Sequence, residues 1–101
     1  MADADFPVEV RHNAAASRFE ATVDGRLCFA AYQLADGVMR MNHTEVPSTL
    51  ENRGIAGELV RAALAFAAAN GQKVLPMCSY VRAYMRRHPE SHALLADGYR
   101  L

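Results

Sequence analysis

The sequence predicts an α/β (α+β) domain with a mostly antiparallel sheet, one parallel strand pair and flanking helices. Three observations support this. Polar and apolar residues alternate over 8–43, an alanine-rich helical pattern fills 54–70, and a short apolar segment follows that helix. A strand reached through a helix normally pairs in parallel with its neighbour. With 101 residues the chain has the size of one domain, so we expect a single domain over 1–101, frayed over 1–6.

Two dipeptides in the first half of the chain predict hairpin turns. Asp24-Gly25 and Asp36-Gly37 are of the type that two-residue hairpin loops favour. After the second turn, Met39 and Met41 alternate with polar residues, which predicts a strand with one buried face. The expected strands are 8–11, 19–23, 27–32 and 38–43, the first two being joined around 12–17.

The second half of the chain changes to a helical period. Apolar residues recur at helical spacing from Ile55 to Ala67, and Asn70-Gly71 is a typical helix stop. The order is therefore β-β-β-β-α-β-α. The remaining expected elements are a short strand at 73–75, a helix at 79–87 stopped by His88-Pro89, and a last helical piece at 91–97.

Charge and cysteine content exclude several classes of protein. Eleven basic and eleven acidic residues cancel, which argues against a partner held by bulk electrostatics, so we expect no nucleic acid and no membrane. Cys28 and Cys78 lie fifty positions apart and form neither a metal pair nor a disulfide framework. With no signal peptide or apolar span, we expect a monomeric cytoplasmic protein with free thiols and no metal.

The segment 51–57 has the features of an anion site. It lies where the fourth strand passes into the long helix, and the first amides of a helix have no partner within it. Gly54 and Gly57 have no Cβ atoms and would let a phosphate approach the backbone. The alternative is a glycine-containing turn before an ordinary helix.

Several motifs resemble one family. Gly54-x-Ala56 is similar to the end of the Gln/Arg-x-x-Gly-x-Gly/Ala loop of the GNAT acetyltransferase superfamily. The segments 43–47 (HTEVP), 53–56 (RGIA) and 76–81 (PMCSYV) resemble its short YjdJ-type branch, in register from about residue 8 to 95. The resemblance implies a minimal GNAT-like acyl-CoA N-acyltransferase fold, with acetyl-CoA as cosubstrate and the parallel strands splayed apart.

The resemblance also implies a binding site. The amides of the helix start would hold the pyrophosphate of acetyl-CoA, while the backbone of the fourth strand would pair with pantetheine. Glu51 departs from the family pattern, because it stands where the superfamily has Gln or Arg and its carboxylate would repel a pyrophosphate. The residues expected to bind the cofactor by these contacts are Asn42, Thr44, Val46, Arg53, Gly54, Ile55, Ala56 and Gly57.

Cys78 is the first candidate catalytic residue. It follows the fifth strand and precedes a helix, whose dipole and free amides stabilise a thiolate, and Arg82 can add to this effect. The thiol can accept an acetyl group or protonate the leaving coenzyme A. The alternative is a small buried residue, which is the interpretation that we give to Cys28.

His43 is the second candidate catalytic residue. It lies at the end of the fourth strand, where an imidazole can remove a proton from an attacking ammonium near neutral pH. Glu45 faces the same side if the strand continues. The alternative is that His43 only caps the strand end.

The segment 80–88 is basic and aromatic. Tyr80, Tyr84 and the arginines between 82 and 87 suit the adenosine of the cofactor and its 3′-phosphate, and suit a nucleic acid less well. A solvated helix face explains the pattern equally well. His88 and His92 have a helical metal-ligand spacing, but Pro89 spoils the geometry and no third ligand is evident.

The sequence therefore predicts an N-acetyltransferase that moves acetyl from acetyl-CoA to an unidentified amine. Because the chain lacks most of the N-terminal helical region of larger relatives, we expect a small or exposed acceptor, such as a protein lysine or N-terminus. The alternative is a non-enzymatic acyl-CoA-binding module in which Cys78 and His43 are structural. A nucleic-acid-binding protein is a third interpretation, which the zero net charge disfavours.

Overall fold

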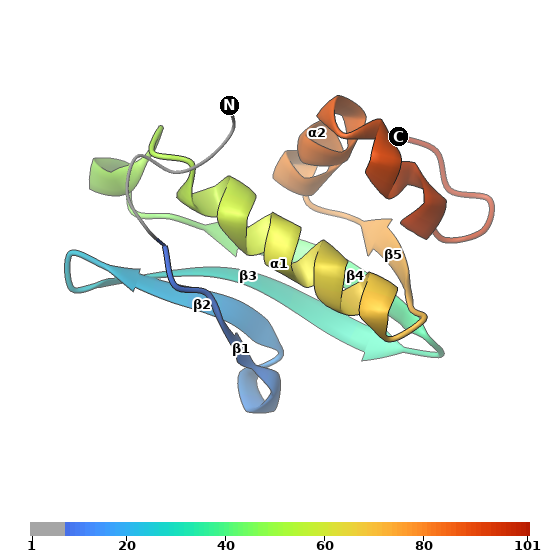
Figure 1. Cartoon of the computed structure of the whole chain (residues 1–101), viewed down its shortest axis with the longest axis horizontal. Helices are drawn as coiled ribbons and strands as arrows, with labels where there is room; N and C mark the ends of the chain where they lie inside the picture. Colours follow the sequence, from blue (N-terminus) through green and yellow to red (C-terminus); the bar gives the residue numbers. More distant parts are fainter. Residues whose placement is uncertain (1–7) are drawn as a thin grey trace.

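The computed structural model describes residues 8–101, and the expected fraying of 1–6 lies outside this range. A five-stranded sheet forms one layer, and the helices pack on it as a second layer (Figure 1). The strands lie side by side in sequence order. Every neighbouring pair is antiparallel except β4 and β5, which are parallel. The predicted mixed sheet with one parallel pair is confirmed.

The strands agree with the expected order, and only the first is displaced. β1 begins at Arg11, because its short ladder pairs residues 11–13 with β2, while Val8 and Val10 pack against the core without pairing. The expected strand at 8–11 therefore overlaps β1 only at Arg11, and its placement over 8–10 was wrong. The strands are β1 (Arg11–Asn13), β2 (Arg18–Val23), β3 (Arg26–Ala35), β4 (Val38–Glu45) and β5 (Lys73–Pro76).

Both hairpin turns are where the dipeptides predict them. Asp24 and Gly25 have φ values of +52° and +75°, and Asp36 and Gly37 have +54° and +75°. Two successive residues with positive φ are what a type I′ turn requires, and its twist matches the twist of the flanking strands. These turns set the register of β2 on β3 and of β3 on β4.

The helices also agree with prediction except at the C-terminal end. The last helical piece starts earlier than expected, with Pro89 as its first residue, and Leu95 instead forms a parallel bridge with Val74 of β5. The expectation of a helix over 91–97 was therefore wrong for 95–97. The helices are α1 (Ile55–Ala69), α2 (Ser79–Arg87) and the short 3₁₀ helices η1 (Ala14–Ala16), η2 (Ser48–Leu50) and η3 (Pro89–Leu94).

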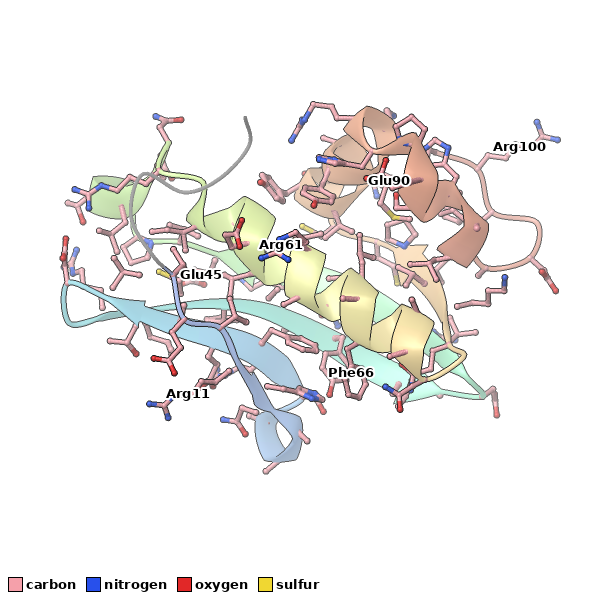
Figure 2. The ribbon with its side chains drawn as sticks, in the orientation of Figure 1. Arg11, Glu45, Arg61, Phe66, Glu90 and Arg100 are labelled. Carbon is pink, nitrogen blue, oxygen red and sulfur yellow. The ribbon has the colours of Figure 1, made fainter. Side chains whose placement is uncertain are left out.

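The core lies between the helices and one face of the sheet. Met39 of β4, Leu59 of α1 and Met85 of α2 are fully buried there. Phe66 points from α1 toward the sheet, where its ring centroid lies 5.8 Å from that of Phe19 (Figure 2). The other face stays open to solvent around Leu27, which is 41 % exposed. Within residues 8–101, none of the helices has the length and apolar character needed to cross a membrane.

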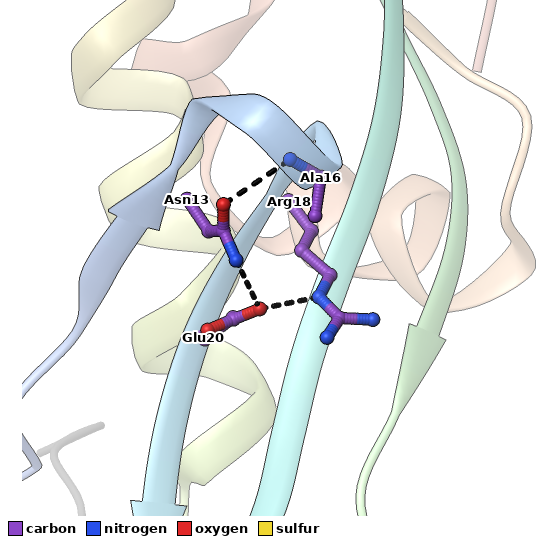
Figure 3. A network of polar contacts seen from close by, with 4 residues as sticks. All are labelled: Asn13, Ala16, Arg18 and Glu20. Carbon is purple, nitrogen blue, oxygen red and sulfur yellow. Dashed lines mark hydrogen bonds and ion pairs between the residues drawn. The ribbon is translucent and has the colours of Figure 1, made fainter.

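A polar network fastens the short edge strand β1 to β2 (Figure 3). The Asn13 amide donates to Glu20 Oε2 over 2.9 Å, and its Oδ1 accepts from the Ala16 amide over 3.1 Å. Arg18 forms an ion pair with the same Glu20 carboxylate. The hydrogen bond from Arg18, and then that from Asn13, hold the pKa of Glu20 below its ordinary value of 4.5.

A β-bulge changes which residues of β4 face the helices. Tyr32 pairs with Met41, but the preceding Ala31 pairs with His43, so Asn42 is an extra residue on β4. Met41 is buried under the helices, and strict alternation would place His43 there too. The extra residue instead places Thr44 on the helix side, opposite Ala30, and turns His43 to the open face.

Candidate functional site

A pocket of about 440 Å³ lies beside the end of β4. Its walls come from β4 and the residue after it, from the turn that connects η2 to α1, and from α2. Figure 2 shows Glu45, one of its residues, on the side of the molecule where α1 begins, away from Glu90. The lining residues are Thr44, Glu45, Val46, Leu50, Glu51, Asn52, Gly54, Ile55, Ala56 and Tyr80.

The pocket lies beyond the point where β4 and β5 part. Their parallel ladder ends with Met41 paired to Pro76. The amides of Met77 and Cys78 then both donate to the Met41 carbonyl, over 2.9 and 3.0 Å, and the chain turns into α2. β4 continues to Glu45, so on this side its last residues have no partner strand within residues 8–101.

The start of α1 points free backbone amides at the pocket. Gly54 is the residue before the first helical turn, with a φ of +79°, and its carbonyl accepts the first helical hydrogen bond from the Glu58 amide over 3.1 Å. The amides of Ile55, Ala56 and Gly57 precede that bond and have no partner within the helix. The helix start on which the anion-site prediction depends is therefore present, and anion binding there stays a prediction.

Carboxylates, rather than cationic side chains, accompany these amides. Glu45 and Glu51 line the pocket, whereas no Lys or Arg does among the described residues. The Arg53 guanidinium instead donates to Asp24 Oδ2 of the β2–β3 turn over 3.3 Å. The electrostatic attraction for an anion therefore comes from the backbone of α1.

Cys78 lies at the edge of the pocket. It is half-buried, directly precedes α2, and its thiol donates to Oγ1 of the lining residue Thr44 over 3.8 Å. The Arg82 guanidinium donates to the carbonyls of Pro76 and Met77, so these hydrogen bonds go to the backbone before Cys78 rather than to its thiol. Cys28 lies in the core, where burial raises the pKa of its thiol.

His43 lies outside the pocket lining. Its Nε2 forms a 3.1 Å hydrogen bond with Glu45, and its ring lies 5.7 Å from the ring of Phe29 on the open face. Glu45 therefore shares a side with His43, as expected. Because the bulge places His43 on the open face, it reaches the pocket only through Glu45, and its catalytic role stays a prediction.

The two tyrosines of α2 have different positions. Tyr80 lines the pocket, and burial raises the pKa of its hydroxyl, an effect that Arg87 partly offsets. Tyr84 is only 8 % exposed and stacks on His88 with 3.9 Å between centroids. A Cβ atom at Gly57 would lie 3.5 Å from Tyr80 Oη, so α1 and α2 pack closely at Gly57.

The structure brings together part of the predicted binding set. Four predicted binding residues do not line the pocket. Arg53 and Gly57 are adjacent in sequence to lining residues, Asn42 is exposed in the bulge, and Tyr84 lies one helical turn after Tyr80. Sequence reasoning missed Leu50 and Asn52; Asn52 has a φ of +66°, a conformation in which Asn is common, so the Asn-x-Gly pattern was an available signal. The predicted binding residues that line the pocket are Thr44, Val46, Gly54, Ile55, Ala56 and Tyr80.

The two histidines with metal-like spacing have other partners. His88 Nδ1 lies 2.7 Å from the Tyr84 carbonyl, and His92 Nε2 lies 2.7 Å from the Met85 carbonyl. Both imidazoles therefore bind backbone carbonyls near the end of α2, and the Met85 carbonyl also accepts from the His88 amide over 3.0 Å. In the described part of the chain, no group of three or more His, Cys, Asp or Glu side chains is placed to hold a metal ion.

A mixed sheet whose two parallel strands part beside the start of a helix is the fold that the family resemblance implied. The sequence comparison identifies the same family. The chain belongs to the GCN5-related N-acetyl-transferase family, whose sequence model matches residues 18–94. The predicted membership of the GNAT superfamily is confirmed.

Among curated proteins, Protein NATD1 of Gallus gallus, Mus musculus and Homo sapiens is 29 % identical to this chain over 86 residues. These matches cover 82 % of this chain and 78 %, 78 % and 76 % of the relatives. Among solved structures, the NMR structure of a GCN5-like protein from Staphylococcus aureus superposes with a TM-score of 0.70 and 20 % identity, covering 87 % of each chain. That likeness shows the fold.

Proposed function

We propose that this protein binds acetyl-CoA and transfers its acetyl group to an amine. The observation that carries the proposal is the pocket itself. Free amides at the start of α1 line it on one side, and the end of β4, beyond its pairing with β5, lines it on the other. A pyrophosphate suits the first wall, and an extended amide chain such as pantetheine suits the second.

The cofactor would extend from the start of α1 toward the point where β4 and β5 part. Its pyrophosphate would accept hydrogen bonds from the amides between Gly54 and Gly57. Tyr80 keeps a neutral hydroxyl because burial raises its pKa, so it can donate to a phosphate. The thioester end would then lie near Cys78, whose thiol already contacts the pocket wall at Thr44.

Acetyl transfer requires one bond to form and one to break. The acceptor nitrogen attacks the thioester carbonyl carbon, the new C–N bond replaces the C–S bond, and coenzyme A leaves as a thiolate. The nitrogen must lose a proton and the thiolate must gain one. His43, paired with Glu45, is the candidate base, and Cys78 is the candidate acid.

A covalent route uses the same cysteine differently. The Cys78 thiolate attacks the acetyl carbonyl and forms a thioester on the protein, and coenzyme A leaves. The acceptor amine then attacks this second thioester and regenerates the thiolate. An acetylated Cys78, formed without an acceptor, distinguishes this route from direct transfer.

Non-enzymatic acyl-CoA binding is the second candidate function. The observation that favours it is the position of His43 on the open face, outside the pocket lining. In that case the protein would bind acetyl-CoA without releasing coenzyme A to any amine.

Two measurements separate these functions. Calorimetry with coenzyme A tests the pocket, and we expect binding that Gly54→Val weakens. Release of free coenzyme A thiol from acetyl-CoA, followed with lysine-containing peptides and small amines, tests transfer. The absence of coenzyme A binding at millimolar concentration would overturn the proposed function, whereas binding without thiol release would favour the binding module.

A further inference from the structure

The pocket in which we propose that a pyrophosphate binds is lined by carboxylates and, among the described residues, by no cationic side chain. Glu51 lines it, is exposed, and has no ion pair with another described residue. Glu45, the other lining carboxylate, forms a hydrogen bond with His43. With no lysine or arginine among the described lining residues, an anionic ligand meets two carboxylates together with the amides of α1.

The two arginines nearest to Glu51 in the sequence form ion pairs with other carboxylates. Arg53 forms an ion pair with Asp24, and Arg61 forms one with Glu58 within α1. The backbone holds Glu51 close to the anion-binding amides, since it ends η2 and lies three residues before Gly54. A phosphate at the amides therefore feels the Glu51 charge with little local compensation.

We infer that Glu51 is a specificity-determining residue of this pocket, which selects coenzyme A against small phosphate ligands. The inference rests on the proposed function. A compact anion such as inorganic pyrophosphate has only the amides to bind, and the carboxylate opposes that contact. Coenzyme A has pantetheine contacts along β4 as well, so it binds in spite of the repulsion. Glu51 thus lowers the affinity for all phosphates and leaves the longer ligand as the one that binds.

Removal of the charge tests this inference directly. We expect Glu51→Gln to tighten inorganic pyrophosphate by roughly tenfold and coenzyme A by roughly threefold in low-salt calorimetry, as one screened charge at this range predicts. The gain is larger for inorganic pyrophosphate because its end oxygens are not esterified and it brings more negative charge to the amides, so the variant loses selectivity. The affinity for pantetheine, which carries no phosphate, should not change. The gain should shrink near 0.5 M salt, because ions screen exposed charges. Glu51→Lys should give a larger gain in the same direction.

Asp36→Asn is the matched control. It changes the net charge by the same amount in the β3–β4 turn, at the opposite end of β4, and Asn tolerates the positive φ of that position. We expect its coenzyme A affinity to equal that of the wild-type protein.

Three results would overturn the inference while leaving the proposed function intact. These are inorganic pyrophosphate binding that Glu51→Gln leaves unchanged or tightens no more than coenzyme A binding, an equal gain in Asp36→Asn, and a gain that extends to pantetheine. Failure of the wild-type protein to bind coenzyme A at millimolar concentration would instead overturn the proposed function itself.

Discussion

The thiol of Cys78 donates a hydrogen bond to Thr44 Oγ1 over 3.8 Å. This contact joins the start of α2 to the end of β4, across the point where β4 and β5 stop pairing. Thr44 also lines the pocket, so the thiol is one residue away from any ligand that lies along β4. The pocket therefore lies next to the point where β4 and β5 separate.

Replacement of Cys78 by alanine should slow acetyl transfer by roughly a hundredfold, the lower end of what a positioned acid contributes. The affinity for coenzyme A should stay nearly unchanged, because the phosphate-binding amides lie on α1. Turnover and calorimetry measure these two effects separately. Mass spectrometry of the wild-type protein with acetyl-CoA alone would detect an acetylated Cys78 if the covalent route operates.

Cys28→Ala is the control for this experiment. Cys28 is fully buried and its raised pKa keeps it protonated, so it should neither carry an acetyl group nor affect turnover per folded molecule. A wild-type rate in Cys78→Ala would show that Cys78 is a packing residue.

Valine at Gly54 should weaken coenzyme A binding and destabilise the fold together. The φ of +79° costs a residue with a Cβ atom about 1–2 kcal/mol, and the branched side chain would stand beside the amides. Gly71→Val is the matched control, since Gly71 has a φ of +66° and open space around it. Urea unfolding should show a similar loss in both variants, and a loss of affinity in both would argue against a phosphate site at Gly54.

His43→Gln should lower turnover with little effect on coenzyme A affinity. His43 lies outside the pocket lining, so its removal leaves the binding surface intact and removes only a proton acceptor. We expect a fall of roughly a hundredfold, the lower end of what a positioned base contributes. Glu45→Gln should reproduce part of the fall, because it removes the partner that orients the imidazole. Unchanged turnover in both variants would show that His43 and Glu45 form a surface contact without a role in catalysis.

Glu20 should contribute a pH-dependent part of the stability. Its pKa is lower in the folded protein than its ordinary value of 4.5, because Arg18 and Asn13 hydrogen-bond to the ionised form. The stabilisation is thus fully present above about pH 4.5 and is lost as the pH falls through the lower, folded pKa. Urea unfolding of Glu20→Gln should show a deficit near neutral pH that shrinks in acid. Glu9→Gln, an exposed carboxyl outside this network, should show no comparable deficit.

Local patterns predicted most of the fold. Asp24-Gly25 and Asp36-Gly37 turn where expected because their backbone geometry depends on two adjacent residues alone. The bounds of α2 agree with prediction because His88-Pro89 ends any helix that reaches it. The first strand was misplaced because the alternation of Val8 and Val10 reflects packing on the core rather than pairing.

The site was harder to predict because it depends on contacts between distant segments. The helix start at Gly54 could be read from the sequence, but the orientation of the Arg53 side chain toward Asp24 could not. Arg82 is a similar case: its charge suggested a role in the site, whereas the structure uses it to bind two carbonyls at the end of β5. The sequence also carried no sign of the extra residue at Asn42, which decides the side on which His43 lies.

The extra residue Asn42 decides which side chains of β4 face the helices and which face the open side of the sheet. Before it, Met39 and Met41 anchor the helices; after it, Thr44 faces the pocket and His43 the open face. No substitution can exchange these roles, because they depend on counting residues rather than on their chemistry. Deleting Asn42 would only remove the bulge, with His43 still opposite Ala31 and Thr44 still opposite Ala30. Inserting one residue into β3 opposite Asn42 would instead bring the imidazole to the helix side and turn the threonine hydroxyl out to water. The assignment of side chains to the site is in this respect a property of chain length, and protein engineering of this strand would have to work by insertion and deletion.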